Sequence, residues 1–165
     1  MNLQKFKECL ETVRESDLKA LSDLIHGARH IILLGNGGSN AITCHIAQDY
    51  TKALGKKALC FGDSSRLTCY ANDYGWELAY KKFLEQFMEE DTVVVLLSSS
   101  GNSQNILNCA QYCVERGNKL VTLSGFSEDN QLRTMYSDKS LHFYVPSKDY
   151  GIVECLHELI LHSVI

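Results

Sequence analysis

Short apolar runs recur along this chain of 165 residues, and each is followed by small polar residues and then by a segment with helical spacing. Four of the runs are rich in β-branched residues and a fifth is weaker; in chain order they are 31–34, 58–61 (the weaker one), 92–97, 120–123 and 141–145. Runs that are nearly continuous, rather than alternately apolar and polar, are typical of parallel strands buried on both faces. The pattern therefore predicts a central, mainly five-stranded parallel sheet.

Segments with helical spacing separate these strands, and such alternation indicates an α/β sandwich with helices on both faces of the sheet. The expected helices are 39–54, 76–90, 102–116, 128–136 and 150–164. Residues 1–28 are expected to form one or two further helices that pack on the sandwich, broken near the helix cap Ser16-Asp17. Because the sequence contains no repeat, low-complexity tract or linker, we expect residues 1–165 to form a single three-layer α/β/α domain.

The charge pattern argues against several classes of partner. Twenty acidic and sixteen basic residues give a formal charge of −4, without a lysine or arginine block that would follow a nucleic-acid backbone or an anionic membrane. No apolar stretch approaches the roughly 20 residues that span a bilayer, and the charged N-terminus is unlike a secretory signal. We therefore expect a cytoplasmic protein that binds neither nucleic acid directly nor a membrane. The seven scattered cysteines lack a C-x-x-C pair and suggest neither disulfides nor a thiolate zinc site.

Two segments of small polar residues follow the first and third long apolar runs, GNGGS at 35–39 and SSSGNS at 98–103. Open parallel sheets bind ligands beyond the C-terminal ends of their strands, where the strand order reverses. A glycine-rich turn that opens a helix presents unpaired backbone N–H groups at the positive end of the helix dipole, which suits a phosphate. The first loop matches neither the P-loop nor the dinucleotide motif, and alone it is equally consistent with a tight turn. Four hydroxyls in the second loop exceed what helix capping needs, so the two loops together predict a phosphate site.

Ionisable side chains lie at helical spacing in two of the expected helices. His45 and Asp49 are four residues apart, so they share one face of the helix that begins at the first loop. In the last helix, Glu154, Glu158 and His162 advance by four residues along a face separate from the apolar stripe. By itself, such a pair is more often a surface hydrogen bond than part of a functional site. We interpret Glu158 as part of a solvated charged face.

Four parts of the sequence resemble the sugar isomerase (SIS) domain family, and within it the phosphoheptose isomerases, which convert sedoheptulose 7-phosphate to D-glycero-D-manno-heptose 7-phosphate. They are GNGGSNAITCHIAQDY at 35–50, ANDYGWE at 71–77, LLSSSGNSQNIL at 96–107 with GNKLVTLSG at 117–125, and VPSKDYGIVECLHELILH at 145–162. The resemblance implies a flavodoxin-like SIS fold, a sugar-phosphate ligand and no organic cofactor. It also implies a homotetramer with sites at subunit interfaces, and a role in lipopolysaccharide or capsule biosynthesis.

The same resemblance implies roles for individual residues. The residues that fall where the family holds the phosphate and sugar are Asn36, Gly37, Gly38, Ser39, Asp73, Ser98, Ser99, Ser100 and Ser103. For Asp73, a solvated turn or helix cap is the alternative. Asp49 and His162 fall at the family's catalytic carboxylate and histidine, and Glu154, which is also expected to bind the substrate, falls where a glutamine commonly lies. Isomerisation through an enediol needs a carbon base and an oxygen acid; Asp49 and His162 can supply both, and the sequence does not decide which is which.

Zinc-containing members of the family take ligands from positions that match His45, Asp49, Glu154 and His162. Two imidazoles and two carboxylates are reasonable zinc ligands, so the resemblance leaves zinc open as a cofactor. Three departures bear on catalysis: Asp49 is one methylene shorter than the family's glutamate, Glu154 is charged where the family has an amide, and Gly151 replaces a frequent aspartate. The alternative hypothesis is a SIS-domain regulator without turnover, which binds a sugar phosphate or docks another protein.

Overall fold

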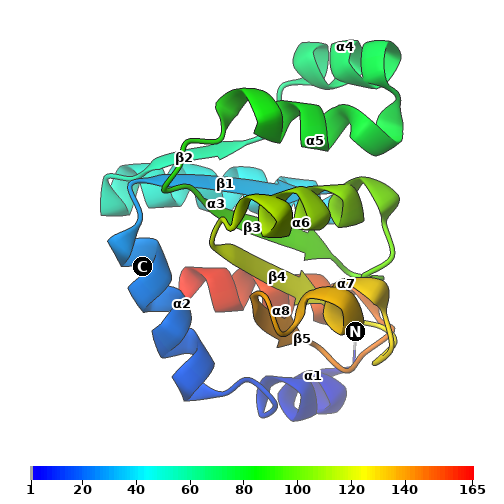
Figure 1. Cartoon of the computed structure of the whole chain (residues 1–165). Helices are drawn as coiled ribbons and strands as arrows, with labels where there is room; N and C mark the ends of the chain where they lie inside the picture. Colours follow the sequence, from blue (N-terminus) through cyan, green and yellow to red (C-terminus); the bar gives the residue numbers. More distant parts are fainter. Residues whose placement is uncertain (1) are drawn as a thin grey trace.

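A five-stranded parallel sheet lies between two layers of helices in the computed structural model, which describes residues 2–165 (Figure 1). The strands are β1 (His30–Gly35), β2 (Lys57–Cys60), β3 (Val93–Ser98), β4 (Leu120–Ser124) and β5 (Leu141–Tyr144). Their order across the sheet is β2-β1-β3-β4-β5, and each neighbouring pair is parallel. The predicted fold class, a three-layer α/β/α sandwich on five parallel strands, is confirmed.

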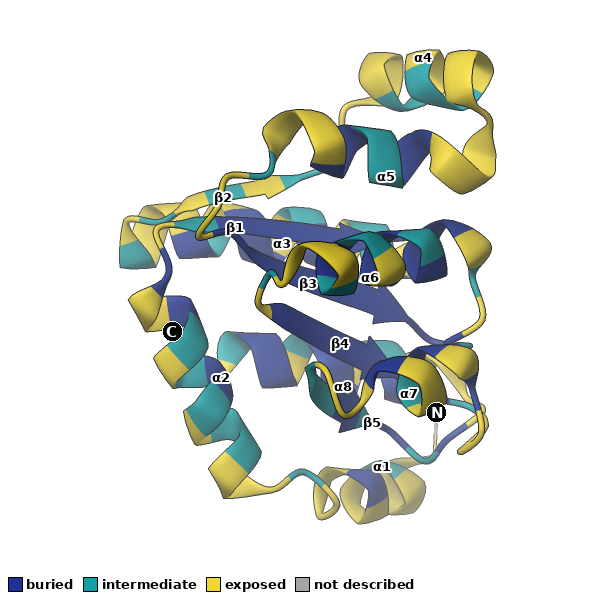
Figure 2. Ribbon diagram, in the orientation of Figure 1, coloured by how far each residue is buried: buried dark blue, intermediate teal, exposed yellow. Residues whose placement is uncertain are grey.

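Helices cover both faces of this sheet. Within residues 2–165 they are α1 (Leu3–Leu10), α2 (Glu15–Gly27), α3 (Gly38–Leu54), α4 (Ser64–Tyr74), α5 (Trp76–Phe87), α6 (Gln104–Arg116), α7 (Gln131–Tyr136) and α8 (Tyr150–His162). Helices α2, α3 and α8 pack against one face, where Ile31 and Leu33 of β1 point. Helices α5, α6 and α7 cover the other face, toward which Ile32 and Leu34 point. Both faces of β1 are therefore buried, which explains why its run is apolar at every position (Figure 2).

The N-terminal segment differs from the prediction in one respect. Helix α1 ends at Leu10 and α2 begins at Glu15, so the break predicted near Ser16-Asp17 is wrong. Asp17 lies in the first turn of α2, where its carboxylate accepts a hydrogen bond from Arg14 Nε at 2.8 Å. An aspartate in the first turn stabilises the helix through the dipole, and the same residue type can therefore stand inside the helix as well as at its cap.

Helix α4 was not predicted from the sequence. Asp63 caps it by accepting a hydrogen bond from the backbone N–H of Arg66 at 2.7 Å. None of its residues is buried, and of its side chains only the partly buried Leu67 and Tyr70 pack against the hydrophobic core between the sheet and helices α5, α6 and α7. In Figure 2 the helix accordingly stands out from the body of the molecule as a largely exposed segment beside α5. So short an apolar stripe gives too weak a periodicity to predict a helix.

The strand order determines where a ligand can bind. The chain leaves β1 for β2 on one side and returns to β3 on the other, so the loops after β1 and β3 are adjacent at the point where the order reverses. The last residue of β1, Gly35, pairs with Leu97 near the end of β3. GNGGS and SSSGNS therefore begin side by side, and each leads into a helix. No helix in residues 2–165 has the length and apolar character needed to cross a membrane.

Candidate active site

The two predicted loops line one cavity of about 230 Å³ at the C-terminal edge of the sheet. Its walls are formed by Asn36, Gly37, Gly38, Ser39, Leu97, Ser98, Ser99, Ser100, Ser103, Tyr150 and Glu154. Apart from Leu97 and Tyr150, every lining residue is one that the sequence analysis placed in the substrate site. Leu97 ends an apolar strand and Tyr150 begins α8, and neither position carried a polar signal that would have marked it.

Two helix N-termini open onto this cavity. Helix α3 begins at Gly38, within the first loop, and α6 begins after Ser103 of the second loop. The N-cap of α3 is Gly37, which has no side chain, and the side chain of Ser103, the N-cap of α6, makes no capping hydrogen bond. The first backbone N–H groups of a helix have no partner within the helix, and the dipole adds positive potential there. The cavity is therefore built to bind an anion such as phosphate.

Serine hydroxyls complete the lining on the β3 side. Ser98 Oγ accepts a hydrogen bond from the backbone N–H of Gly101 at 3.1 Å and donates to Ser103 Oγ at 3.2 Å. Ser100 Oγ accepts from the backbone N–H of Asn102 at 3.2 Å. Ser99 Oγ is buried and has no partner among residues 2–165. A buried hydroxyl without a partner destabilises the protein by about 1–3 kcal/mol, and a phosphate or sugar oxygen would satisfy it.

Asn105 joins the two loops, and the sequence analysis did not single it out. The side-chain amides of Asn36 and Asn105 pair reciprocally, with Nδ2 to Oδ1 distances of 2.9 and 2.8 Å. Asn105 is buried in the first turn of α6, so this pair holds α6 against the loop after β1. The structure thus gives Asn36 a role in holding the loops together, in addition to the sugar contact predicted for it. An asparagine inside a helix, where its propensity is low, was the available signal.

Glu154 contributes a carboxylate to the cavity from α8. A β-carbon added at Gly38 would lie 2.5 Å from Glu154 Oε1, so the Glu154 carboxylate lies directly against the start of α3, and a larger residue at position 38 would displace it. In the part of the chain that the structure describes, no lysine or arginine lines the cavity. Anion binding there depends on neutral donors and helix dipoles. The Glu154 carboxylate, which accepts hydrogen bonds, suits the hydroxyls of a sugar rather than its phosphate.

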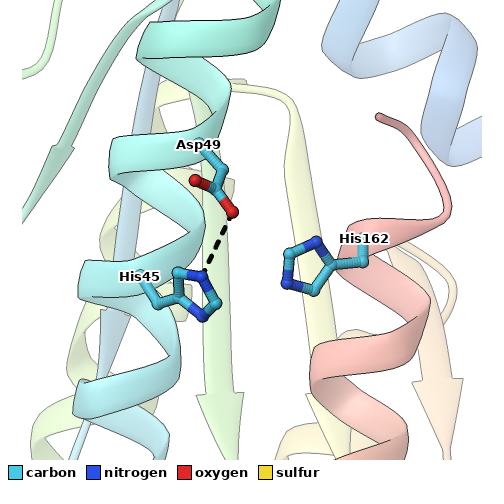
Figure 3. A group of neighbouring side chains, drawn as sticks. All are labelled: His45, Asp49 and His162. Atoms are coloured by element: carbon cyan, nitrogen blue, oxygen red, sulfur yellow. Dashed lines mark ion pairs between the residues drawn. The ribbon is translucent and has the colours of Figure 1, made fainter.

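A second group of side chains lies between α3 and α8 (Figure 3). His45 and Asp49 project from α3, and the His45 Nε2 atom is 3.2 Å from Asp49 Oδ2. His162 projects toward them from α8, with its ring centroid 5.1 Å from that of His45. One ligand atom of each residue lies within 4.8 Å of those of the other two. Folding therefore brings together three residues that the sequence analysis assigned to catalysis or metal binding.

Glu154 and Asp73 lie outside this group. Glu154 precedes His162 by eight residues on α8, about 12 Å of helical rise, so a single chain does not gather the four zinc ligands that the resemblance implied. Asp73 stands in the last turn of α4, where it accepts hydrogen bonds from Cys69 Sγ at 3.5 Å and Asn72 Nδ2 at 2.9 Å. It does not line the cavity. Within one chain, its surroundings are those of an exposed helix end.

Glu158 has a different environment from the one predicted. Its Oε1 atom lies 2.8 Å from His45 Nδ1, in hydrogen-bond geometry, and 3.9 Å from His162 Nε2. The interpretation of Glu158 as part of a solvated charged face is therefore incomplete: the side chain is 36% exposed, but it also contacts α3. Helices α3 and α8 pack on the same face of the sheet, so the row of charged residues on α8 runs beside α3 at the surface. The regular spacing of Glu158 between Glu154 and His162 was the signal in the sequence.

The family follows from comparison with known proteins. Residues 3–125 match the model of the SIS domain. The chain belongs to the SIS domain family. This SIS domain is 31% identical to the phosphoheptose isomerase of Fusobacterium nucleatum over 171 aligned positions, covering 99% of the chain and 86% of that relative. The resemblance seen in the sequence is thereby confirmed.

Solved structures show how widely the fold is used. A phosphoheptose isomerase from Neisseria gonorrhoeae has a TM-score of 0.88 at 24% identity, with 98% of this SIS domain and 89% of that chain covered. The sugar isomerase domain of a transcription factor from Sphaerobacter thermophilus has a TM-score of 0.66 at 16% identity, with 98% and 84% covered. The same fold therefore occurs in an enzyme and in a regulator, so function must be argued from the site.

The donor chemistry of the second group suits zinc. In this SIS domain His45 has a carboxylate oxygen beside each ring nitrogen, Glu158 at Nδ1 and Asp49 at Nε2. A neutral imidazole carries one N–H, and of these two contacts only the one at Nδ1 has hydrogen-bond geometry. The lone pair of Nε2 then faces the Asp49 carboxylate, an arrangement that a cation between them would stabilise. Two imidazoles and one carboxylate form a common set of catalytic zinc ligands.

Proposed function

We propose that this SIS domain is an aldose–ketose isomerase that converts sedoheptulose 7-phosphate to D-glycero-D-manno-heptose 7-phosphate through an enediol. The observation that carries the proposal is the cavity where the two loops meet, since it combines two uncapped helix N-termini with a set of hydroxyls. The phosphoheptose isomerase of Fusobacterium nucleatum, which aligns with 99% of the chain, supports the choice of substrate. The heptose phosphate would supply a surface polysaccharide such as lipopolysaccharide or capsule.

The loops bind the phosphate. Backbone N–H groups at the starts of α3 and α6 donate to its oxygens, together with the hydroxyls of Ser39, Ser98, Ser100 and Ser103. These donors are fixed by the fold before the ligand arrives, so binding costs little reorganisation. Glu154 accepts hydrogen bonds from sugar hydroxyls on the α8 side of the cavity.

Asp49 and His162 transfer the protons. One of them removes a proton from a carbon next to the carbonyl, and the other moves a proton between the two oxygens, which converts the ketose to the aldose through the enediol. A carboxylate and an imidazole both accept and release protons, so each can act in either direction of the reaction.

A homotetramer with sites at subunit interfaces is part of the proposal. Asp49 follows Ser39 by ten residues on α3, about 15 Å of helical rise, so the proton-transfer pair stands apart from the phosphate cavity of its own chain. Helix α4 buries no residue in the single chain; its last residue, Tyr74, is exposed, as are Trp76 and Leu78 at the start of α5. Such a surface is suited to contact with another subunit, which would bring further groups to each cavity.

Zinc is the proposed cofactor, held by His45, Asp49 and His162. When bound, the metal supplies a Lewis acid that stabilises negative charge on a substrate oxygen. Asp49 has two carboxylate oxygens, so one can bind a cation while the other accepts a proton. His45 keeps its Nδ1 atom engaged with Glu158, which leaves its Nε2 atom facing the group.

The activity can be tested directly. Purified protein incubated with sedoheptulose 7-phosphate is expected to form the aldose, which ¹³C NMR distinguishes from the ketose. Asp49→Asn and His162→Ala are each expected to abolish turnover. Glu115→Gln, at an exposed glutamate on α6, is the matched control and is expected to retain the wild-type rate. A full rate in both site variants would refute the assignment of the chemistry.

A regulator without turnover is the second candidate. Asp49 is one methylene shorter than the glutamate found at this position in the family, and a displacement of about 1 Å at a catalytic group can cost about 100-fold in rate. The transcription factor with a sugar isomerase domain has the same fold. If sugar phosphates raise the melting temperature while no aldose appears by NMR, the regulator is the correct function.

A further inference from the structure

Glu158 connects the two helices that carry the proton-transfer residues. Its carboxylate comes from α8 and its Oε1 atom accepts the hydrogen bond from His45 Nδ1 of α3 at 2.8 Å. The same oxygen is 3.9 Å from His162 Nε2. Residues 45 and 158 lie 113 positions apart in the chain, so the packing of α3 on α8 creates this contact.

The contact determines which nitrogen of His45 is free. A neutral histidine in water carries its proton on either ring nitrogen, and the hydrogen bond made by one nitrogen decides the state of the other. When the ring is neutral and Nδ1 donates to Glu158, Nε2 keeps its lone pair. That atom lies 3.2 Å from Asp49 Oδ2, and His45, Asp49 and His162 each offer one ligand atom to the same group.

Asp49 cannot fix the ring in this way. It stands one turn from His45 on the same helix, and its oxygen lies near the nitrogen that a metal would need. Glu158 reaches the opposite nitrogen from the facing helix. Carboxylates that accept the second N–H of a metal-bound histidine hold its tautomer and ring orientation, and their loss typically weakens metal binding 10–100-fold.

We propose that Glu158 is a positioning residue, which holds His45 with Nε2 available to bind a divalent transition-metal ion together with Asp49 and His162. The inference rests on the metal-dependent isomerase proposed above and adds to it a residue that acts through His45. The effect of Glu158 on metal affinity can be measured without substrate, and therefore independently of turnover.

Metal binding by the purified, metal-free protein tests the inference. Co²⁺ is titrated by its visible absorption, and the Kd for Zn²⁺ is measured by competition with a chromophoric chelator. Glu158→Leu removes the acceptor and is expected to raise both Kd values about 10–100-fold. Glu158→Ala repeats the removal with a smaller side chain. Glu158→Gln keeps an oxygen acceptor at the same length and is expected to restore most of the affinity.

The control variant is Glu115→Leu. Glu115 is an exposed glutamate of α6 whose Oε1 accepts a hydrogen bond from Gln111 Nε2 at 2.8 Å, so it matches Glu158 in residue type, helical setting and hydrogen bonding. Its replacement is expected to leave both Kd values unchanged. Melting temperatures of all variants, measured without metal, show whether each one is folded.

Ring ¹⁵N NMR of His45 provides a second readout. In the metal-free wild type the ring is expected to carry its proton on Nδ1, and in Glu158→Leu on Nε2. An unchanged Kd in the Leu and Ala variants, a wild type that binds neither metal, or an Nε2-protonated ring in the wild type would each overturn the inference. If the Kd values follow the expected pattern but no aldose forms from sedoheptulose 7-phosphate, the proposed function fails and the role of Glu158 stands.

Discussion

Acid is expected to destabilise this fold through a histidine outside the candidate site. His157 is fully buried on α8; its Nε2 atom donates to the carbonyl oxygen of Ser124 at 3.1 Å, and its Nδ1 atom has no partner within residues 2–165. The pKa of His157 is lowered from 6.5 to about 4, mainly by burial; the hydrogen bond to Ser124 opposes this change, and the nearby His142 adds to it. The ring is therefore neutral in the folded protein at neutral pH.

The sign and size of the effect follow from the two pKa values. Below pH 6.5 the unfolded chain binds a proton at His157, whereas the folded chain does so only near pH 4. The contribution of His157 to the free energy of unfolding is thus fully present above pH 6.5 and is lost as the pH falls toward 4. The loss is about 1.4 kcal/mol per pH unit, or about 3 kcal/mol across the interval. That is a large part of the 5–15 kcal/mol typical of a folded domain.

The assay is urea unfolding followed by circular dichroism, at a fixed protein concentration and at several pH values from 7.5 to 4.5. His157→Gln keeps an N–H donor for the Ser124 carbonyl oxygen but does not titrate. Its free energy of unfolding is expected to fall less steeply than that of the wild type between pH 6.5 and 4, by about 3 kcal/mol over the interval. Parallel curves for the two proteins would refute the reasoning. His142, whose pKa burial also lowers to about 4, is expected to account for a second part of the wild-type slope.

Two further predictions concern the second loop and the assembly. Gly101 has a φ of +65°, and a β-carbon there would lie 1.9 Å from Asn130 Oδ1. Gly101→Ala is therefore expected to lower the free energy of unfolding in urea by about 2–3 kcal/mol and to abolish phosphate binding measured by calorimetry. Unchanged values in both assays would contradict the account of the loop. Light scattering is expected to give about 74 kDa, four times the 18.6 kDa chain, and Trp76→Asp is expected to give the monomer mass; a monomeric wild type would contradict the proposed assembly.

Local features of the sequence were sufficient to predict the architecture. The apolar runs that form β1, β3 and β4 are buried at every position. A strand buried between two layers of helices must be apolar on both faces, so each run could be recognised from its own residues alone. The sequence also predicted that the two loops lie close together, because the C-terminal ends of parallel strands lie at the same edge of the sheet. Helix α4 could not be predicted in the same way, since it has no buried face in the single chain.

The sequence by itself determined the α/β/α sandwich and the positions of the two loops that line the cavity, because these depend on hydrophobic periodicity and on loops at the ends of strands. Only the tertiary structure decided what each charged residue of α8 meets: Glu154 faces the cavity, and Glu158 faces His45. Helical spacing tells which side chains share a face, but the neighbour of that face depends on how helices pack across the whole sheet. The reciprocal pair of Asn36 and Asn105 has the same origin, since it joins the loop after β1 to the first turn of α6, and the two residues are 69 positions apart in the chain.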